Sequence, residues 1–188
     1  MAARQIPWIS PDEFLDAEEL SDTKHSYHNG IVTAMAGGSY AHGRLAGNLL
    51  GSLFAALRGR NCAVVGSDVK LHAGDSFVYP DLMVIRGLAS KIPARPSVIT
   101  NPVLIAEVLS PGTEAYDRGE KARLYRASPT VKQYALLSQD QPLIEIHTRH
   151  DDGTWRITEV SGLESVCEFS SLDCRIPFSD LYEGVLDA

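Results

Sequence analysis

The sequence has no long hydrophobic run, and this absence bears on where the protein works. None of its apolar segments approaches the roughly 18 consecutive residues of a membrane-spanning helix. The N-terminal stretch from Met1 to Leu20 also lacks the apolar core of a signal peptide and soon becomes acidic. We therefore expect a cytoplasmic protein that does not bind membranes.

Cysteine is also scarce. The three cysteines, Cys62, Cys167 and Cys174, are an odd number and do not have the spacing of metal ligands. In a cytoplasmic protein such thiols are reduced and mostly structural, and a Cys167–Cys174 disulfide is the alternative. The sequence contains neither a glycine-rich phosphate loop nor the turn that presents a nucleophilic serine, so nothing predicts chemistry based on those motifs.

Positive charge is in the minority, because the 188 residues carry a net charge of −7. A domain that binds nucleic acid by charge alone is usually basic, so the overall composition argues against that class. The charge is uneven, however. Residues 86–132 contain eight Lys or Arg against four acids, whereas residues 133–188 contain three Arg against eleven acids. The basic stretch could meet phosphates, or it could be a solvated helix face.

The hydrophobic pattern predicts one α/β domain over residues 1–188. The length fits a single domain, and 44% apolar with 22% charged residues is a normal globular composition. Ser10 is the predicted N-cap of a short helix that begins at Pro11. Leucines every four residues predict a helix over 41–58, in which regularly spaced glycines indicate close packing, and Asn29-Gly30 predicts a hairpin. Short apolar runs predict strands over 62–65, 68–72, 78–85, 103–109, 131–138, 143–148 and 155–160, with helices over 113–127 and within 171–186.

Two of these strands carry one acid each inside an apolar run. Asp81 follows Tyr79-Pro80 and precedes Leu82 to Ile85, and Glu107 lies within the run from Val103 to Leu109. Burial of an uncompensated carboxylate is costly, so a partner is expected. If the strands lie side by side, the acids can share Mg²⁺ or Mn²⁺, which takes one or two carboxylates from a protein. That is the chemistry of metal-assisted phosphodiester cleavage; the alternative for Asp81 is a turn carboxylate bonded to backbone N–H groups.

The helix that follows Glu107 places Asp117, Lys121 and Tyr125 on one face. If this helix packs on the sheet, the Lys121 ammonium reaches toward the two acids and can stabilise negative charge developing on a phosphate. The alternative for Lys121 is an ordinary helix pair with Asp117.

Four further residues are candidates for contact with a substrate: His42, Asp68, Arg118 and Arg123. The alternative for His42 is a capping or core role, and the alternative for Asp68 is a hydrogen bond to a nearby loop. Arg118 and Arg123 belong to the basic stretch that could meet phosphates.

Several short motifs follow one another in the order of a known family. They are Lys24-His25-Ser26-Tyr27-His28-Asn29-Gly30, Met35-Ala36-Gly37-Gly38-Ser39, His42, Ser67-Asp68, Tyr79-Pro80-Asp81, Glu107-Val108-Leu109-Ser110-Pro111, and Asp117, Lys121 and Tyr125. Over about residues 10 to 148 this ordered set resembles the Uma family of predicted restriction endonucleases, placed in the PD-(D/E)XK nuclease superfamily. The resemblance implies a restriction-endonuclease-like fold, with a mixed central β-sheet flanked by helices on both faces.

The resemblance also implies an activity, which is the Mg²⁺- or Mn²⁺-dependent hydrolysis of DNA. Asp81 and Glu107 correspond to the metal-binding acids, and Leu109 stands where the superfamily has its lysine. Members of the Uma family carry the lysine on the next helix, which implies that Lys121 is the third catalytic residue. We expect a homodimer, because two sites suit the two strands of a duplex and two-fold dimers are the commonest assemblies.

Three positions depart from the family pattern. Ser26 replaces a usual acid, Asn29 a usual aspartate, and glutamine occupies an acidic position near Gln133-Tyr134. Ser26, Leu109 and the acidic net charge favour an alternative function, in which a catalytically impaired, dimeric protein keeps the nuclease fold and binds nucleic acid or has a structural role.

Overall fold

The computed structural model describes residues 9–35 and 37–186, whose strands form two six-stranded sheets and one two-stranded sheet. The central sheet has the order β12 (Trp155–Ser161), β11 (Leu143–Arg149), β10 (Gln133–Ser138), β9 (Pro102–Leu109), β6 (Leu82–Arg86) and β3 (Cys62–Gly66). The outer sheet has the order β2 (Ile31–Ala34), β1 (His25–His28), β5 (Ser76–Val78), β4 (Lys70–Ala73), β8 (Arg95–Ile99) and β7 (Lys91–Ile92). The small sheet pairs β13 (Val166–Phe169) with β14 (Cys174–Pro177).

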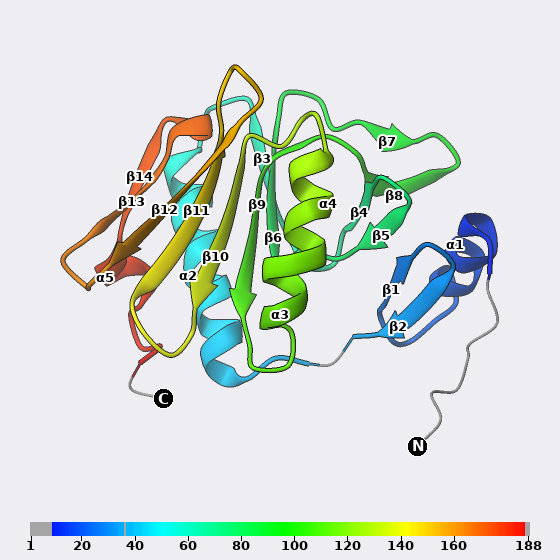
Figure 1. Ribbon diagram of the computed structural model, residues 1–188, viewed down its shortest axis with the longest axis horizontal. Coiled ribbons are helices and arrows are strands. Elements are labelled where there is room, and N and C mark those ends of the chain that lie inside the picture. Colours follow the sequence, from blue (N-terminus) through cyan, green and yellow to red (C-terminus); the bar gives the residue numbers. More distant parts are fainter. Residues whose placement is uncertain (1–8, 36, 187–188) are drawn as a thin grey trace.

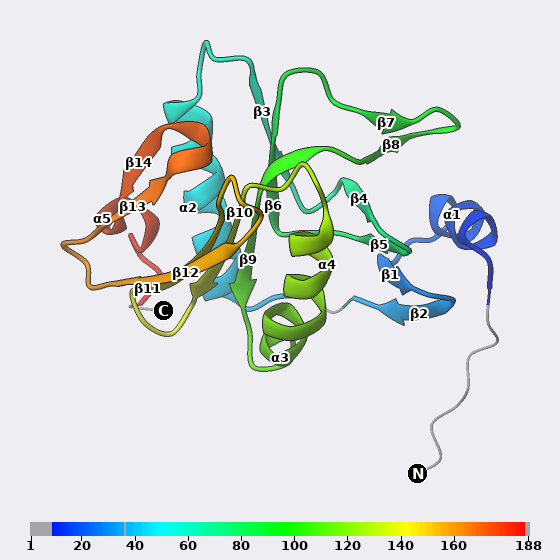
Figure 2. The same cartoon turned by 45° about the horizontal axis from the view of Figure 1, so that its top comes forward.

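Helices cover both faces of the central sheet (Figure 1). Behind the sheet in that view lies α2 (Tyr40–Ala56), against which α5 (Phe178–Leu181) packs. In front lie α3 (Glu114–Tyr116), a π turn (Asp117–Lys121) and α4 (Ala122–Ala127). The outer sheet extends to one side of the central sheet, toward α1 (Pro11–Glu19), as Figure 2 shows.

The alternation of side chains along β9 explains why helices cover both faces. Leu104, Ala106 and Val108 are buried in the core on the α2 side, whereas Ile105 and Leu109 are buried in the core on the α4 side. β9 pairs parallel with β10 and antiparallel with β6, so the sheet is mixed. The predicted fold class is therefore confirmed, although the outer sheet was not foreseen as a separate sheet.

The long helix α2 confirms the leucine pattern but not the expected role of its glycines. The leucines that recur every four residues are buried: Leu45, Leu49, Leu53 and Leu57. Gly43, Gly47 and Gly51 are exposed, and a Cβ added at any of them meets no atom within 4 Å. The prediction of close packing at these glycines was wrong, because the helix turns them toward solvent.

Local signals near the N-terminal end of the described chain are confirmed. Ser10 caps α1, where its Oγ accepts a hydrogen bond from the Glu13 N–H and the Glu13 carboxylate accepts one from the Ser10 N–H. β1 and β2 form the hairpin, and its turn residues Asn29 and Gly30 have φ angles of 44° and 86°. Positive φ at both positions is what a two-residue type I′ turn requires, and Asn-Gly supplies it with little strain.

Two predicted elements are interrupted in the structure. The run 78–85 divides into β5 of the outer sheet and β6 of the central sheet, and the chain crosses between them at Tyr79-Pro80-Asp81. Pro80 has no N–H with which to continue a strand ladder, which suits this crossing. The helix expected over 113–127 contains a π turn, and the C-terminal tail contains the β13–β14 pair as well as a short helix.

Two observations concern the expected location of the protein. Among residues 9–35 and 37–186, no helix is both long and apolar enough to cross a membrane. All three cysteines are free thiols, and Cys167 and Cys174 are buried.

Candidate active site

The crossing between the two large sheets places Asp81 beside Glu107. β6 and β9 pair antiparallel with Leu82 opposite Ala106, so the next residues outward, Asp81 and Glu107, are neighbours across the strands. The Asp81 N–H donates to Glu107 Oε2 over 3.3 Å, and Asp81 Oδ2 accepts from the Val108 N–H over 2.8 Å. The two acids therefore come together, and Asp81 has in addition the backbone hydrogen bond that its alternative role required.

The π turn brings Lys121 to these acids from the α4 side of the sheet. The Lys121 ammonium lies 3.0 Å from Glu107 Oε1 and 2.8 Å from Asp117 Oδ1. Tyr125 follows on the same helical segment, and its hydroxyl donates to Glu107 Oε1 over 2.8 Å. π turns are frequent at functional sites, and this one presents Asp117 and Lys121 together toward the sheet. Both roles considered for Lys121 are present, since it pairs with Asp117 and with Glu107.

Burial and charge set the protonation of this cluster. Burial raises the pKa of Glu107 to about 7, and the nearby carboxylates of Asp81 and Asp117 add to the rise, while Lys121 opposes it. Although burial lowers it, the pKa of Lys121 lies above its ordinary value because Glu107 and Asp117 lie beside the ammonium. The cluster thus contains three carboxyl groups and one lysine, an excess of negative charge that favours a further cation.

His42 approaches the cluster from the first turn of α2. Its Nε2 lies 3.2 Å from Asp81 Oδ2, and this hydrogen bond raises the pKa of His42 against the effect of burial. Ser39 caps the helix by accepting from the His42 N–H, and its hydroxyl donates to Gln139 Oε1. Gln139 donates to the Leu109 carbonyl over 2.9 Å. These contacts fasten the start of α2 to the end of β9 and so hold His42 beside Asp81.

The other three candidates for substrate contact lie outside this cluster. Asp68 is exposed and pairs with Lys24. Arg118 is held by two carboxylates, one on α3 and one on β11. Arg123 lies on α4 and is exposed. The structure therefore brings four of the seven candidates together and leaves these three apart from them.

The departures from the family pattern have different structural settings. The Leu109 side chain is buried on the same side of β9 as Glu107, and Lys121 reaches Glu107 from the helix, where it can take the place of the absent strand lysine. Ser26 lies on β1 and its hydroxyl donates across the hairpin to a backbone carbonyl of β2. Gln133 is buried and hydrogen-bonded at both ends of its side-chain amide. Both polar replacements are accommodated by contacts away from the acids.

Three residues of the cluster were not predicted as site residues. Asp117 and Tyr125 share the helix face of Lys121. Their spacing of four residues on either side of Lys121 indicates in the sequence that all three lie together. Gln139 follows β10 and contacts Ser39, which precedes α2. No local pattern in the sequence indicates that pairing, because the two residues are 100 positions apart.

The oxygen donors suit a hard divalent cation. Asp81 and Glu107 provide two neighbouring carboxylates, which is the number that Mg²⁺ or Mn²⁺ commonly takes from a protein while it keeps several waters. Within the described ranges no three His, Cys, Asp or Glu side chains are grouped so that they could hold a metal ion. The arrangement therefore fits an ion completed by water and substrate better than a centre held by protein ligands alone, such as a structural zinc.

Known proteins resemble this chain along most of its length. Residues 11–174 match the Uma2 family, described as "Putative restriction endonuclease". In Synechocystis sp., "Uncharacterized protein slr1290" is 34% identical over 182 residues, which cover 96% of this chain and 94% of that protein. A second Synechocystis protein, "Uncharacterized protein sll1609", is 33% identical over 164 residues, or 86% and 93% of the two chains.

A solved structure shares the fold. The crystal structure of "a putative nuclease belonging to DUF820" from Anabaena variabilis superposes with a TM-score of 0.78 at 14% identity, over 95% of this chain and 99% of that chain. The agreement at such low identity shows a common architecture. With the match to residues 11–174 and the two relatives above 30% identity, it follows that this chain belongs to the Uma2 family.

Proposed function

We propose that this protein is an endonuclease that hydrolyses phosphodiester bonds of DNA with a Mg²⁺ or Mn²⁺ ion. One observation carries the proposal, which is the convergence of Asp81, Glu107 and Lys121 from three separate elements of the fold. The family description, a restriction endonuclease, supports DNA as the substrate.

Each residue has a role that follows from its position. Asp81 and Glu107 hold the cation, and His42 orients Asp81 through its Nε2 contact. A bound Mg²⁺ or Mn²⁺ ion supplies Lewis-acid stabilisation to a phosphate and lowers the pKa of a bound water. The Lys121 ammonium has three N–H donors and contacts two carboxylates, those of Asp117 and Glu107. One donor is left for a phosphate oxygen on which negative charge develops.

A homodimer belongs to the same proposal. One site of this kind cuts one strand, so two sites related by a two-fold axis provide a cut in each strand of a duplex. A mass of twice 20.5 kDa by light scattering on a sizing column supports the dimer, and a monomer at the concentration of the cleavage assay argues against it.

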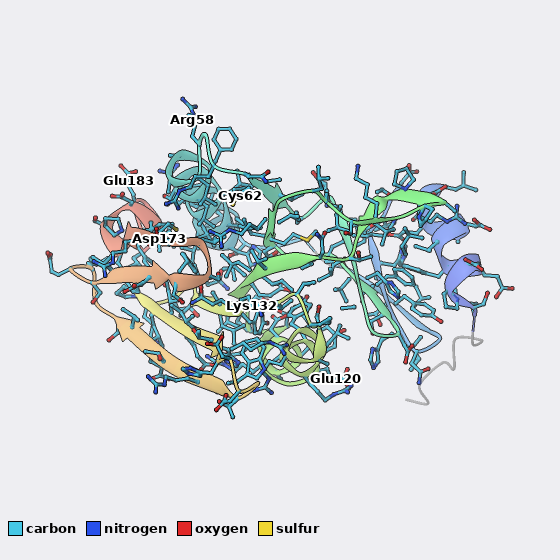
Figure 3. All side chains as sticks on the ribbon, turned by 90° about the horizontal axis from the view of Figure 1, so that it is seen from above. Arg58, Cys62, Glu120, Lys132, Asp173 and Glu183 are labelled. Carbon is cyan, nitrogen blue, oxygen red and sulfur yellow. The ribbon has the colours of Figure 1, made fainter. Side chains whose placement is uncertain are left out.

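Cleavage of supercoiled plasmid DNA tests the activity. We expect the wild type to nick or linearise the plasmid with Mg²⁺ or Mn²⁺, and Asp81→Asn and Glu107→Gln to lose cleavage, because each removes one charged ligand. Glu120→Gln is the matched control, since Glu120 is an exposed acid of the same π turn (Figure 3). Equal cleavage by all four proteins points to a contaminating nuclease and contradicts the proposal.

A catalytically impaired nucleic-acid-binding protein is the second candidate. It is favoured by the closure of the site, because Glu107 is only 2% exposed and its Oε1 is already engaged by Lys121 and Tyr125. Thermal unfolding with millimolar Mn²⁺ separates the two candidates. A metal at 100 times its dissociation constant stabilises the fold by about 2.7 kcal/mol, which raises the Tm by roughly 5–10 °C. No rise in the wild type favours the second candidate.

A further inference from the structure

Lys70, the first residue of β4, is a buried lysine that forms no ion pair with any residue in 9–35 or 37–186. The residue is 6% exposed, and among the described residues no carboxylate oxygen lies within 4 Å of its ammonium. The ammonium nitrogen lies 5.5 Å from the centroid of the Tyr79 ring. A cation–π contact offsets only part of the free energy that is lost when an ammonium leaves water.

The other basic residues near the sheet edge have their counter-ions in place. Arg95 pairs with two acids of α1, and Arg118 and Lys121 each pair with two carboxylates. Lys24 lies 5.7 Å from the same Tyr79 ring as Lys70, but it is paired with Asp68. Lys70 is the exception among these buried and half-buried cations.

The position of Lys70 links it to the candidate active site. β4 and β5 pair with Leu71 opposite Val78, so Lys70 lies across from Tyr79, two positions before Asp81. The neighbouring Lys24 side chain is 41% exposed, so the place beside the Tyr79 ring is open to solvent. The Tyr79 ring beside which both lysines lie therefore belongs to the segment that carries Asp81.

We propose that Lys70, together with Lys24, binds a backbone phosphate of the DNA next to the one that is cleaved. This inference rests on the proposed function and adds to it a contact outside the acid cluster. The lysine pair, defined as Lys24 and Lys70 beside Tyr79, supplies positive charge that the acids at the cleavage centre do not. When DNA is absent, Asp68 forms an ion pair with Lys24. The phosphate displaces Asp68 easily, because the Asp68 side chain is exposed.

Binding measured without cleavage tests this inference. The probe is a short fluorescein-labelled DNA duplex, titrated by anisotropy with millimolar Ca²⁺ in place of Mg²⁺, at several salt concentrations. We expect Lys70→Met to bind about tenfold more weakly and to reduce the slope of log affinity against log salt by about one, as the loss of one phosphate contact does. Lys70→Arg keeps the charge and retains most of the affinity.

The control is Lys132→Met, which removes the same charge from an exposed site. The Lys132 N–H bonds to the Val103 carbonyl, at the end of β9 opposite Glu107, and Figure 3 looks onto that end of the sheet. Equal affinity and salt slope for Lys70→Met and Lys132→Met overturn the inference and leave the proposed function standing if the wild type binds and cleaves DNA. A wild type that binds no duplex at low salt overturns both.

A second variant guards against a folding defect in Lys70→Met. Asp68→Asn frees the Lys24 ammonium without touching a buried group, since the Asp68 side chain is 91% exposed. We expect this variant to bind the duplex several-fold more tightly and with a steeper salt dependence. A gain in affinity cannot arise from partial unfolding, and an unchanged affinity for Asp68→Asn contradicts the assignment of the lysine pair.

Discussion

Removal of the Lys121 charge should destabilise the protein strongly, because this ammonium is the counter-ion of two buried carboxylates. Glu107 and Asp117 are each 2% exposed, and they lie 3.0 Å and 2.8 Å from the Lys121 nitrogen. Lys121→Met keeps the length of the side chain and removes the charge. Breaking a buried ion pair by deleting one partner costs about 3–5 kcal/mol, since an uncompensated charge remains. For a chain of this length that loss lowers the Tm by roughly 6–20 °C.

The loss should depend on pH, and its sign follows from Glu107. The pKa of this carboxyl is about 7 in the folded protein, above its ordinary value of 4.5. Between pH 4.5 and 7 the folded state binds more protons than the unfolded chain. The contribution of Glu107 to the free energy of unfolding therefore falls as the pH rises from about 4.5 to 7. Without the Lys121 charge the pKa of Glu107 rises further. Lys121→Met should therefore lose more free energy of unfolding at pH 8 than at pH 5.

Urea unfolding followed by circular dichroism measures both effects, with the slope m checked for constancy. Lys132→Met serves as the control, and as an exposed substitution it should change the free energy of unfolding by no more than about 0.5 kcal/mol. In the double variant Glu107→Gln/Lys121→Met, one of the stranded charges is gone. We expect this variant to be more stable than the sum of the single losses indicates, by about 1–3 kcal/mol. A Lys121→Met loss below about 1 kcal/mol at pH 8 would refute the reasoning.

Three further predictions concern neighbouring features. Tyr125→Phe removes the hydroxyl that donates to Glu107 Oε1 and should lower the free energy of unfolding by about 1–3 kcal/mol in a urea titration; an unchanged midpoint speaks against that hydrogen bond. Burial raises the pKa of the Cys167 thiol to about 12, so at pH 8 this thiol remains protonated. Mass spectrometry after brief iodoacetamide treatment of the folded protein should therefore show Cys62 alkylated before Cys167. The reverse order contradicts the buried placement of Cys167. Gly30→Ala forces a Cβ into a turn with φ of 86° and should lower the free energy of unfolding by about 1–2 kcal/mol. Gly47→Ala, at an exposed helical position with open space, should raise it by about 0.5–1 kcal/mol. Thermal melts that rank the two variants in the opposite order contradict both assignments.

Local physics accounts for the parts of the structure that the sequence predicts well. The Asn29-Gly30 turn, the Ser10 cap and the leucine face of α2 each depend on residues within a few positions of one another, so their signals are complete in the sequence. The two strand acids were also readable, because a carboxylate inside an apolar run requires a compensating partner wherever it lies. Their joint assignment with Lys121 depended in addition on the family resemblance.

Long-range pairing decided the rest. The sequence does not show that β5 and β6 belong to different sheets, and it is their separation at Pro80 that sets Asp81 against Glu107. It does not show that the glycines of α2 face solvent, or that Ser39 binds Gln139 from 100 positions away. Lys70 has no unusual neighbours along the chain, and only the fold buries it beside Tyr79. Turns, caps and amphipathic faces are determined by the sequence alone because their energies are local, whereas the charge environment of a buried side chain depends on which distant strands and helices the whole core brings to it.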